Sequence, residues 1–329
     1  MSPITVTTSL KRSQSHLAWD NSIEPVLRVR SGETVSFDCL DASNGQITPD
    51  STVDVMKSLV LTRFDQVNGP VFVDGAAPGD TLQVDILSVA PGAWGWTACI
   101  PGFGLLADEF PEPALKIWEL DTENGVTYFD KEKKIKIPLK PFAGEMGVAR
   151  GVKGTFSTIP PYATGGNLDT KHLTAGATLY LPIEVEGALF SIGDGHAAQG
   201  DGEVCGTAIE TPMRVSVRLT VRKDRPYTKT PHFSTPKITL DNEEHYCTTG
   251  VDARMRLATR AAVRNMIDFL CAEHGFTRVE AYMLCSVVGD LRLHEVVDMP
   301  NYVVGMMIPR SILGPHQGSQ RNLSAPNPF

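Results

Sequence analysis

Several features that would place a chain in a function class at once are missing from this sequence. No apolar run approaches the ~20 residues that a membrane-spanning helix needs, and the first 20 residues lack the apolar core of a secretory signal. The six cysteines are dispersed without a CxxC pair, so we expect free thiols in a reducing cytoplasm. The HExxH, GxSxG and GxxxxGK[ST] motifs are absent too, which argues against zincin, α/β-hydrolase and P-loop enzymes.

Positive charge is also in short supply. The 329 residues include 30 Lys and Arg against 38 Asp and Glu, a formal net charge of −8. Phosphate backbones and anionic lipid repel such a chain, so we expect no nucleic-acid partner and no membrane partner. The 42% of hydrophobic and 21% of charged residues are ordinary for a folded globular protein, which excludes a disordered or fibrous chain.

Turn residues and alternating strands dominate the first two thirds of the chain. The 29 glycines and 23 prolines favour a β-rich fold over a helix bundle. Apolar and polar residues alternate strictly in Met213–Arg222 and again in Thr81–Ile86, the pattern of strands with one buried face. Between them, Ala90–Pro113 is rich in Gly, Pro and aromatic residues with little periodicity. We expect a long loop there that either covers a site or fills a subunit contact.

The end of the chain has a different pattern. Asp252 is placed to cap a helix that runs to His274, and Thr277 and Glu280 form the capping box of a second helix. We therefore predict a β-rich α+β fold, with β-sandwich-like sheets and a smaller C-terminal α/β part. Residues 1–225 would form the β-rich catalytic region and residues 226–329 the C-terminal region, packed together as one unit. The final segment, from residue 315 onward, should be a tail or an arm on a neighbouring subunit, and the Pro/Gly-rich arms suggest a homo-oligomer.

The densest group of chemically useful side chains lies in residues 191–203. Asp194, His196, Gln199, Asp201 and Glu203 occur there among four glycines, which allow the backbone to turn sharply. Asp194 and His196 point the same way if the segment is extended, a natural arrangement for two ligands of one metal. The alternative is a polar turn with solvated acids.

Three weaker candidates lie elsewhere. Residues 164–172 combine Gly-Gly with Asn167, Asp169 and His172, and Asp41 follows a predicted strand. Glu145 is a single acid in an apolar segment flanked by glycines. Such a carboxyl group can have a raised pKa and act as a general base, although an exposed turn acid is an equally good interpretation of the residues alone.

Taken together, these segments resemble the acetamidase/formamidase family. The matching pieces are collinear and run from about residue 16 to residue 221: Trp19-Asp20-Asn21, Asp41–Gln46, Asn68–Val71, Pro78-Gly79-Asp80, Pro141–Ala149, Gly165–Asp169 and Gly193–Glu203. The C-terminal helices fit more loosely. This chain has His172 where some members have Asp, so His172 is a weaker site candidate than His196.

The resemblance implies hydrolysis of a short aliphatic amide, formamide or acetamide, to ammonia and a carboxylate by a divalent-metal enzyme. Asp41, Asp169, Asp194 and His196 are then the candidate metal ligands. Zn²⁺ would be the catalytic ion and Ca²⁺ a second, structural one.

Catalysis also needs a group that moves protons. Glu145 would take the proton of the attacking water and return it to the departing nitrogen, with Glu203 as the next candidate. The alternative role for Asp201 and Glu203 is to orient His196. A related metal-dependent hydrolase of another small amide and a non-catalytic β-sandwich that binds a metal or ligand stay open.

Overall fold

The computed structural model describes residues 8–132, 134–237 and 243–313, so the expected C-terminal tail lies outside the described residues. The strands are β1 (Thr8–Leu10), β2 (Ser15–His16), β3 (Ala18–Trp19), β4 (Leu27–Arg30), β5 (Glu33–Cys39), β6 (Val67–Asp74), β7 (Thr81–Pro91), β8 (Trp94–Cys99), β9 (Ala114–Glu119), β10 (Val126–Asp130), β11 (Ile135–Pro138), β12 (Phe142–Val148), β13 (Phe156–Ser157), β14 (Gly165–Asn167), β15 (Thr178–Pro182), β16 (Phe190–His196), β17 (Met213–Arg222), β18 (His232–Ser234), β19 (His245–Asp252), β20 (Asp290–Glu295) and β21 (Tyr302–Pro309). The helices are α1 (Met255–His274) and α2 (Arg278–Val288), with short 3₁₀ turns at Val53–Lys57, Leu61–Arg63 and Arg310–Leu313.

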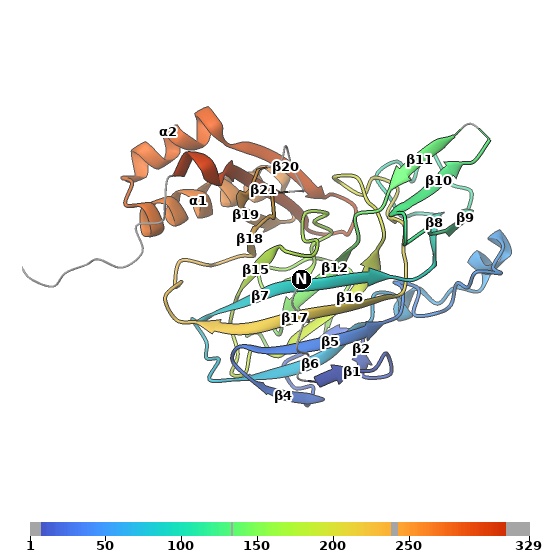
Figure 1. The fold of residues 1–329 in the computed structure, drawn as a ribbon, viewed down its shortest axis with the longest axis horizontal. Helices are drawn as coiled ribbons and strands as arrows, with labels where there is room; N and C mark the ends of the chain where they lie inside the picture. The colour runs from blue at the N-terminus through green and yellow to red at the C-terminus, as the bar shows by residue number, and fades with distance from the viewer. Residues whose placement is uncertain (1–7, 133, 238–242, 314–329) are drawn as a thin grey trace, which may run out of the picture.

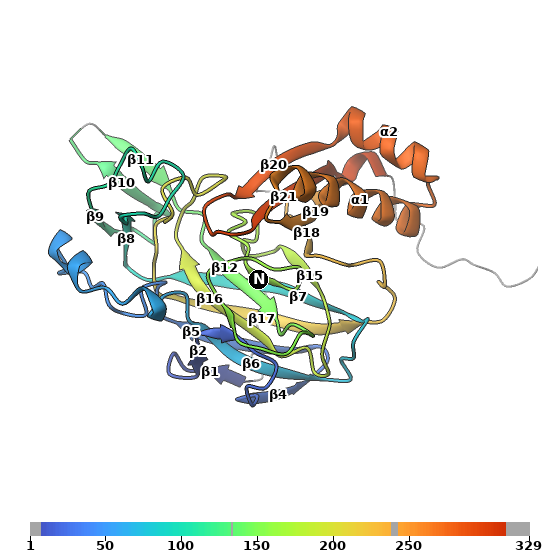
Figure 2. The same ribbon diagram turned by 180° about the vertical axis from the view of Figure 1, so that it is seen from behind.

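Two sheets packed face to face form the body of the molecule (Figures 1 and 2). The larger sheet has nine strands in the order β1-β5-β17-β7-β15-β18-β19-β21-β20, and the smaller follows β14-β12-β16-β6-β2 with β4 also on β6. Their inner faces share one apolar core, to which both sheets contribute: Val35, Phe37, Val215 and Val217 from the larger, and Val71, Met146, Phe190 and Ile192 from the smaller. The predicted β-rich fold with sandwich-like sheets is confirmed.

The alternating strand of the sequence is β17, at the centre of the larger sheet. It pairs with β5 on one side and β7 on the other. Val215, Val217 and Leu219 are fully buried in the core, while Arg214 and Arg218 on the opposite face are exposed. Full burial of each such aliphatic side chain contributes about 1.5–3 kcal/mol, so the alternation fixes which face of this strand meets the smaller sheet.

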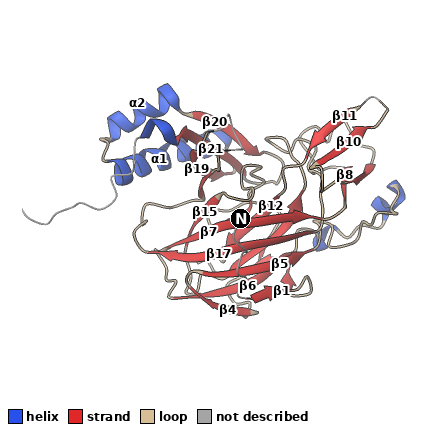
Figure 3. Ribbon diagram, in the orientation of Figure 1, coloured by secondary structure: helices blue, strands red, loops and turns tan. Residues whose placement is uncertain are grey.

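The helices gather at one corner of the molecule, over the end of the nine-stranded sheet (Figure 3). α1 packs on β19 and β21, and it ends at Gly275, whose φ of +71° is the left-handed C-cap conformation. The predicted capping box of α2 is present, with Thr277 and Glu280 bonded reciprocally. The predicted cap at Asp252 is wrong: Asp252 ends strand β19, and α1 begins at Met255.

The segment expected to be an irregular loop between Ala90 and Pro113 contains a strand. Trp94–Cys99 forms β8, which pairs antiparallel with β9. Trp96 of β8 is completely buried, in a cluster with Phe64 and Ile100.

The proposed boundary near residue 225 falls inside the nine-stranded sheet. β17 precedes it, while β18, β19, β21 and β20 follow it in the same sheet. Both regions, residues 1–225 and 226–329, contribute strands to this one sheet. Their division into a catalytic region and a C-terminal region stays a prediction. No helix in the described ranges has the length and apolarity to span a membrane.

Candidate metal and active site

Three short strands bring the glycine-rich motifs together. β12 lies between β14 and β16, so that Glu145 is paired with Asn167 on one side and with Gly193 on the other. The backbone nitrogen of Asp169 also donates to the carbonyl of Gly144. Segments that are far apart in the chain thus meet at one end of the smaller sheet.

His196 is the centre of the resulting cluster. Its Nε2 lies 2.9 Å from Asp194 Oδ2 and 3.1 Å from Glu210 Oε2, with Glu203 Oε1 at 3.9 Å. Its Nδ1 is 2.8 Å from Gln199 Oε1 and 3.8 Å from Asp169 Oδ1. Two sets of three ligand atoms lie within 4.8 Å of one another: those of Asp169, His196 and Glu203, and those of Asp194, His196 and Glu210.

Gly144 leaves the space into which these groups point. A Cβ atom at this position would lie 2.5 Å from Asp169 Oδ1, 2.9 Å from His196 Cε1 and closer still to Asp194 Oδ2. Three predicted metal ligands therefore face one small volume beside the backbone of β12. Asp194 and His196, the predicted pair, lie side by side, and Asp169 lies next to His196.

Burial and crowding perturb the acids strongly. Burial and the charge of Asp169 raise the pKa of Glu203 well above its usual value, and burial raises the pKa of Glu210 to about 8. Burial raises the pKa of Asp169 to about 6. Burial would lower the pKa of His196, but the charges of Asp194 and Glu210 outweigh it and raise that pKa well above 6.5. The cluster holds more negative charge than one imidazolium can balance.

A cavity of about 40 Å³ opens beside the cluster. Its polar wall includes Asp169, Asp194, His196, Glu203 and Glu210, and its apolar wall includes Phe64, Trp96, Ile100 and Phe103. At roughly 10–15 Å³ for a water molecule on this measure, the cavity has room for about three waters or a molecule of a few heavy atoms. Trp96 and Phe103 thus line the site, while Trp94 packs in the cluster behind them.

Asp41 lies next to this cavity but is occupied otherwise. Its Oδ1 accepts hydrogen bonds from Trp96 Nε1 at 2.9 Å, from the Ser43 nitrogen at 3.0 Å and from the Ser43 hydroxyl. Its ligand atoms are not in either group of three around His196. In this arrangement Asp41 holds the indole of Trp96 against the cavity.

The two predicted catalytic acids lie in different surroundings. Glu145 is completely buried on β12, and the side chain of Trp19 approaches its carboxylate. Burial, reinforced by the charges of Asp65, Asp194 and Asp169, raises its pKa well above the usual value. Glu145 does not line the 40 Å³ cavity, whereas Glu203 lines it and also lines a neighbouring pocket of about 570 Å³.

Three further acids of the cavity wall escaped the sequence analysis: Asp65, Glu210 and Asp298. Asp298 interrupts an apolar stretch, Val296-Val297-Asp298-Met299, which is the signal that singled out Glu145. Asp65 and Glu210 are each followed by a polar residue, Gln66 and Thr211, so that signal would not have found them. Asp298 accepts a hydrogen bond from Asn167 Nδ2 at 3.0 Å, so the C-terminal region contributes directly to the site.

The backbone is strained where the acids are attached. Asp65, Asp169, Asp194 and Glu203 have φ values of 54°, 40°, 52° and 45°. Non-glycine residues rarely adopt this left-handed region, at a cost of about 1–3 kcal/mol each. Such strain persists where the surrounding structure holds a functional group in place, and here it is concentrated in one cluster of carboxylates.

Comparison with known proteins shows the family to which this chain belongs. The model of the acetamidase/formamidase family matches residues 4–153 and 150–314. This chain belongs to the acetamidase/formamidase family. The match identifies it as an amidohydrolase of the formamidase/acetamidase type, and amide hydrolysis is the corresponding class of reaction.

Relatives and solved structures agree with this assignment over most of the chain. A formamidase of Methylophilus methylotrophus is 27% identical, with 91% of this chain and 89% of the relative covered. An acetamidase structure from Bacillus halodurans has a TM-score of 0.84 at 30% identity, with 93% and 99% covered. A predicted acetamidase/formamidase of Thermoanaerobacter tengcongensis has a TM-score of 0.85 at 28% identity, with 93% and 96% covered.

Proposed function

We propose that this member of the family hydrolyses a short aliphatic amide, formamide or acetamide, to ammonia and a carboxylate with the help of a divalent metal. The observation that carries the proposal is the 40 Å³ cavity with aromatic side chains on one wall and the carboxylate-ringed His196 on the other. An acyl group of one or two carbons fits the apolar wall, and the reacting carbonyl would then face the polar one.

The residues present fit a metal ion. Both oxygens of Asp169 and Oδ1 of Asp194 are buried without a hydrogen-bond partner in the described residues. The ion pairs of Asp169, Asp194, Glu203 and Glu210 in the described ranges are all with His196, so a divalent cation would offset buried negative charge.

The donor set suggests which ion binds and which residues hold it. Asp169, Asp194 and His196 would hold the metal together with Glu210. One imidazole among carboxylates suits Zn²⁺. A structural Ca²⁺ would draw on the surplus carboxylate oxygens, including Oδ2 of Asp41, whose Oδ1 is already hydrogen-bonded. When bound, the metal supplies polarisation of the amide carbonyl and acidification of a water.

Glu203 is the better placed of the two proposed proton carriers. It lines the cavity and has a raised pKa, whereas Glu145 is buried behind the cavity wall. We therefore assign to Glu203 the transfer of a proton from water to the departing nitrogen. Glu145 is the alternative residue for this transfer. Gln199 orients the imidazole, because its Oε1 is 2.8 Å from His196 Nδ1 and its Nε2 donates to the Asp169 carbonyl at 2.7 Å.

The experiment is ammonia release from formamide, acetamide and benzamide, with metal content measured on the same preparation by elemental analysis. We expect both small amides to be turned over, with little preference, since one methylene discriminates by only ~1–3 kcal/mol. Faster turnover of benzamide would mean that the larger pocket of about 570 Å³, and not the 40 Å³ cavity, binds the acyl group. Bound metal without ammonia release from any amide would favour a non-catalytic binding protein.

We also propose a cytoplasmic homo-oligomer. All six cysteines of the chain are free thiols, which fits a reducing compartment. Val279, Tyr282, Met283 and Val287 form an apolar stripe on the outer face of α2 and are 57–79% exposed. A contiguous stripe of this kind is typical of a protein contact, and a second copy of the same surface can cover it around a two-fold axis. Mass measurement over a range of protein concentrations tests the assembly.

A further inference from the structure

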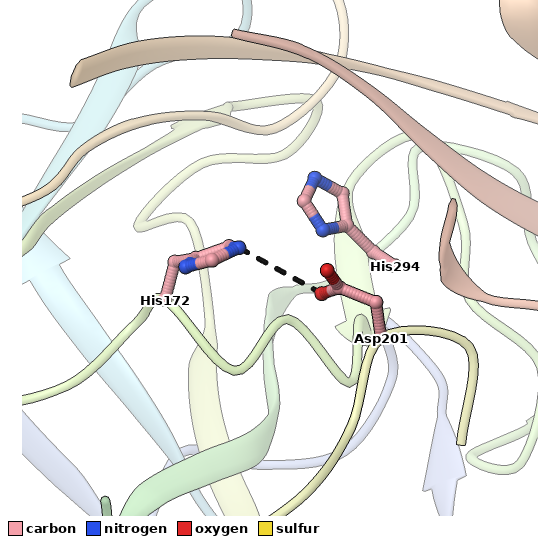
Figure 4. A group of neighbouring side chains, drawn as sticks. All are labelled: His172, Asp201 and His294. Atoms are coloured by element: carbon pink, nitrogen blue, oxygen red, sulfur yellow. Dashed lines mark ion pairs between the residues drawn. The ribbon is translucent and has the colours of Figure 1, made fainter. Parts of the chain in front are cut away.

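We propose that His172, Asp201 and His294 form a second metal site, separate from the cluster around His196, that binds Zn²⁺. The three side chains come from different segments and converge on one point (Figure 4). His172 follows β14, Asp201 lies in the loop after β16, and His294 is on β20. The site shares no residue with the groups of Asp169, Asp194, His196, Glu203 and Glu210.

The spacing of the three ligand atoms suits one ion. They lie within 4.8 Å of one another, and His172 Nε2 is 3.7 Å from Asp201 Oδ1, too far for a hydrogen bond. Zn²⁺ bonds of about 2.0–2.2 Å in a tetrahedron place two ligand atoms roughly 3.3 Å apart, so a small movement of the side chains would complete the site. Ring nitrogens and a carboxylate are also the donors that zinc takes in three-ligand sites.

Each of the three side chains presents a polar atom that the fold leaves unused. His172 Nε2, Asp201 Oδ1 and His294 Nδ1 are buried and have no hydrogen-bond partner in the described residues. His172 is 2% exposed and His294 is completely buried. Burying a polar group without a partner costs about 1–3 kcal/mol, so three such atoms around one point call for a shared ligand.

The other oxygen of Asp201 is fully occupied. Its Oδ2 accepts from Lys171 Nζ at 3.1 Å and from Arg292 Nη1 at 3.3 Å. These two contacts hold the carboxylate in place, and Figure 4 shows Asp201 facing His172, with the ion pair between them. The same cations oppose a divalent ion electrostatically, so we expect a site of moderate affinity that tightens when one of them is removed.

The rings are held from behind by packing. Phe233 stacks on His172 and meets His294 edge-on at 5.7 Å. His294 Nε2 lies against Cys247 Sγ at 3.7 Å and against Gly305, where a Cβ atom would collide with it. The ring of His294 therefore sits with Nε2 turned to β19 and β21, which leaves Nδ1 for the metal.

The site has an open side. His172, Asp201 and Lys171 line the 570 Å³ pocket, so three protein ligands would leave a coordination position facing that pocket. The pocket is also lined by Glu203, which places the second metal site and the proposed amide site on either side of one shared space.

The test is zinc stoichiometry of the full chain. Metal-stripped protein is titrated with Zn²⁺ against a chromophoric chelator, and the site is also filled with Co²⁺ to record its visible absorption. We expect H172A and H294A each to bind one Zn²⁺ fewer than the parent chain and to lose the same part of the Co²⁺ spectrum. D201N, which keeps the shape of the side chain, should behave in the same way if the alanine variants fold poorly.

Two controls separate this site from the others. H196A should lose a different metal ion and retain the Co²⁺ signal that H172A loses, so failure of one assignment leaves the other testable. H232A removes another fully buried imidazole that lies outside the ligand groups and should keep the full stoichiometry. K171Q should bind the second Zn²⁺ several-fold more tightly. Unchanged stoichiometry and unchanged Co²⁺ spectra in H172A, H294A and D201N would overturn the proposal.

Discussion

Replacement of Gly144 by Ala adds one methyl group where the proposed metal ligands converge. Gly144 lies in β12 with an ordinary φ, so the backbone tolerates alanine and the effect is steric. The new Cβ would be 2.5 Å from Asp169 Oδ1, and ordinary van der Waals contact begins at 3.4 Å, so that oxygen must retreat by about 0.9 Å. Asp194 Oδ2 must move farther, and His196 less.

The expected effect follows from these displacements. Overpacking of a tight site costs typically ~1–3 kcal/mol of stability, and a misplacement of about 1 Å in a catalytic site costs on the order of 10²-fold in rate. We therefore predict that Gly144→Ala lowers kcat/KM for formamide and acetamide by about 10²-fold and weakens metal binding. The protein should stay folded, because the change is one methyl group.

The assay is ammonia release and metal content for Gly144→Ala beside a matched control. Gly200→Ala is that control: Gly200 lies in the loop after β16, and a Cβ there would meet nothing within 4 Å. The control should behave as the parent chain does. Wild-type activity and wild-type metal content in folded Gly144→Ala would refute the reasoning, because Asp169, Asp194 and His196 would then not share a functional volume.

The remaining predictions concern proton transfer, pH and assembly. Glu203→Gln should retain metal and lose ~10²-fold or more in turnover, whereas Glu145→Gln should lose less turnover. A larger loss in Glu145→Gln would identify Glu145 as the base, and loss of metal in Glu203→Gln would identify Glu203 as a ligand. Burial raises the pKa of Glu295 to about 8 from 4.5, so the folded state holds a proton that the unfolded state releases, and stability falls as pH rises between these values. The free energy of unfolding of the metal-free protein, measured in urea, should therefore fall between pH 5 and pH 8, and this fall should be smaller by a few kcal/mol in Glu295→Gln. An equal fall in both proteins would contradict the prediction. Val287→Asp, at 79% exposure on α2, should shift the oligomer toward monomer in light-scattering measurements, while a concentration-independent mass for both proteins would show that α2 forms no interface.

Local patterns in the sequence predict local structure well. The alternation of Met213–Arg222 predicts both the strand and its buried face, and Thr277 with Glu280 predicts the start of α2, because each depends on neighbours a few positions away. The strand Trp94–Cys99 was missed because its partner, Ala114–Glu119, lies beyond a long connection. The cap at Asp252 was misplaced because strand β19 continues through that residue and competes with the helix for it.

The site was predictable only where its residues are close in sequence. Asp194 and His196 are two positions apart on one strand, so the sequence alone places them together. Glu210 and Asp298 reach the cavity through the sheet topology, which brings a loop before β17 and the connection between β20 and β21 to the end of β16. Whether a buried acid faces His196, like Asp169, or a tryptophan, like Asp41, depends on side-chain directions that no spacing rule supplies.

The contribution of Asp298 has a consequence for how the protein is made. At about 5–20 residues per second, roughly 4 to 18 s pass between the synthesis of Glu210 and that of Asp298. At the start of that interval the ribosome-bound chain already holds most of the acids of the cavity, yet it lacks Asp298 and the strands β19, β20 and β21. The nascent chain must therefore keep a highly charged half-site hydrated until its last strands join the sheet, and any arrest before residue 298 releases a polypeptide with an exposed sheet edge and an incomplete centre.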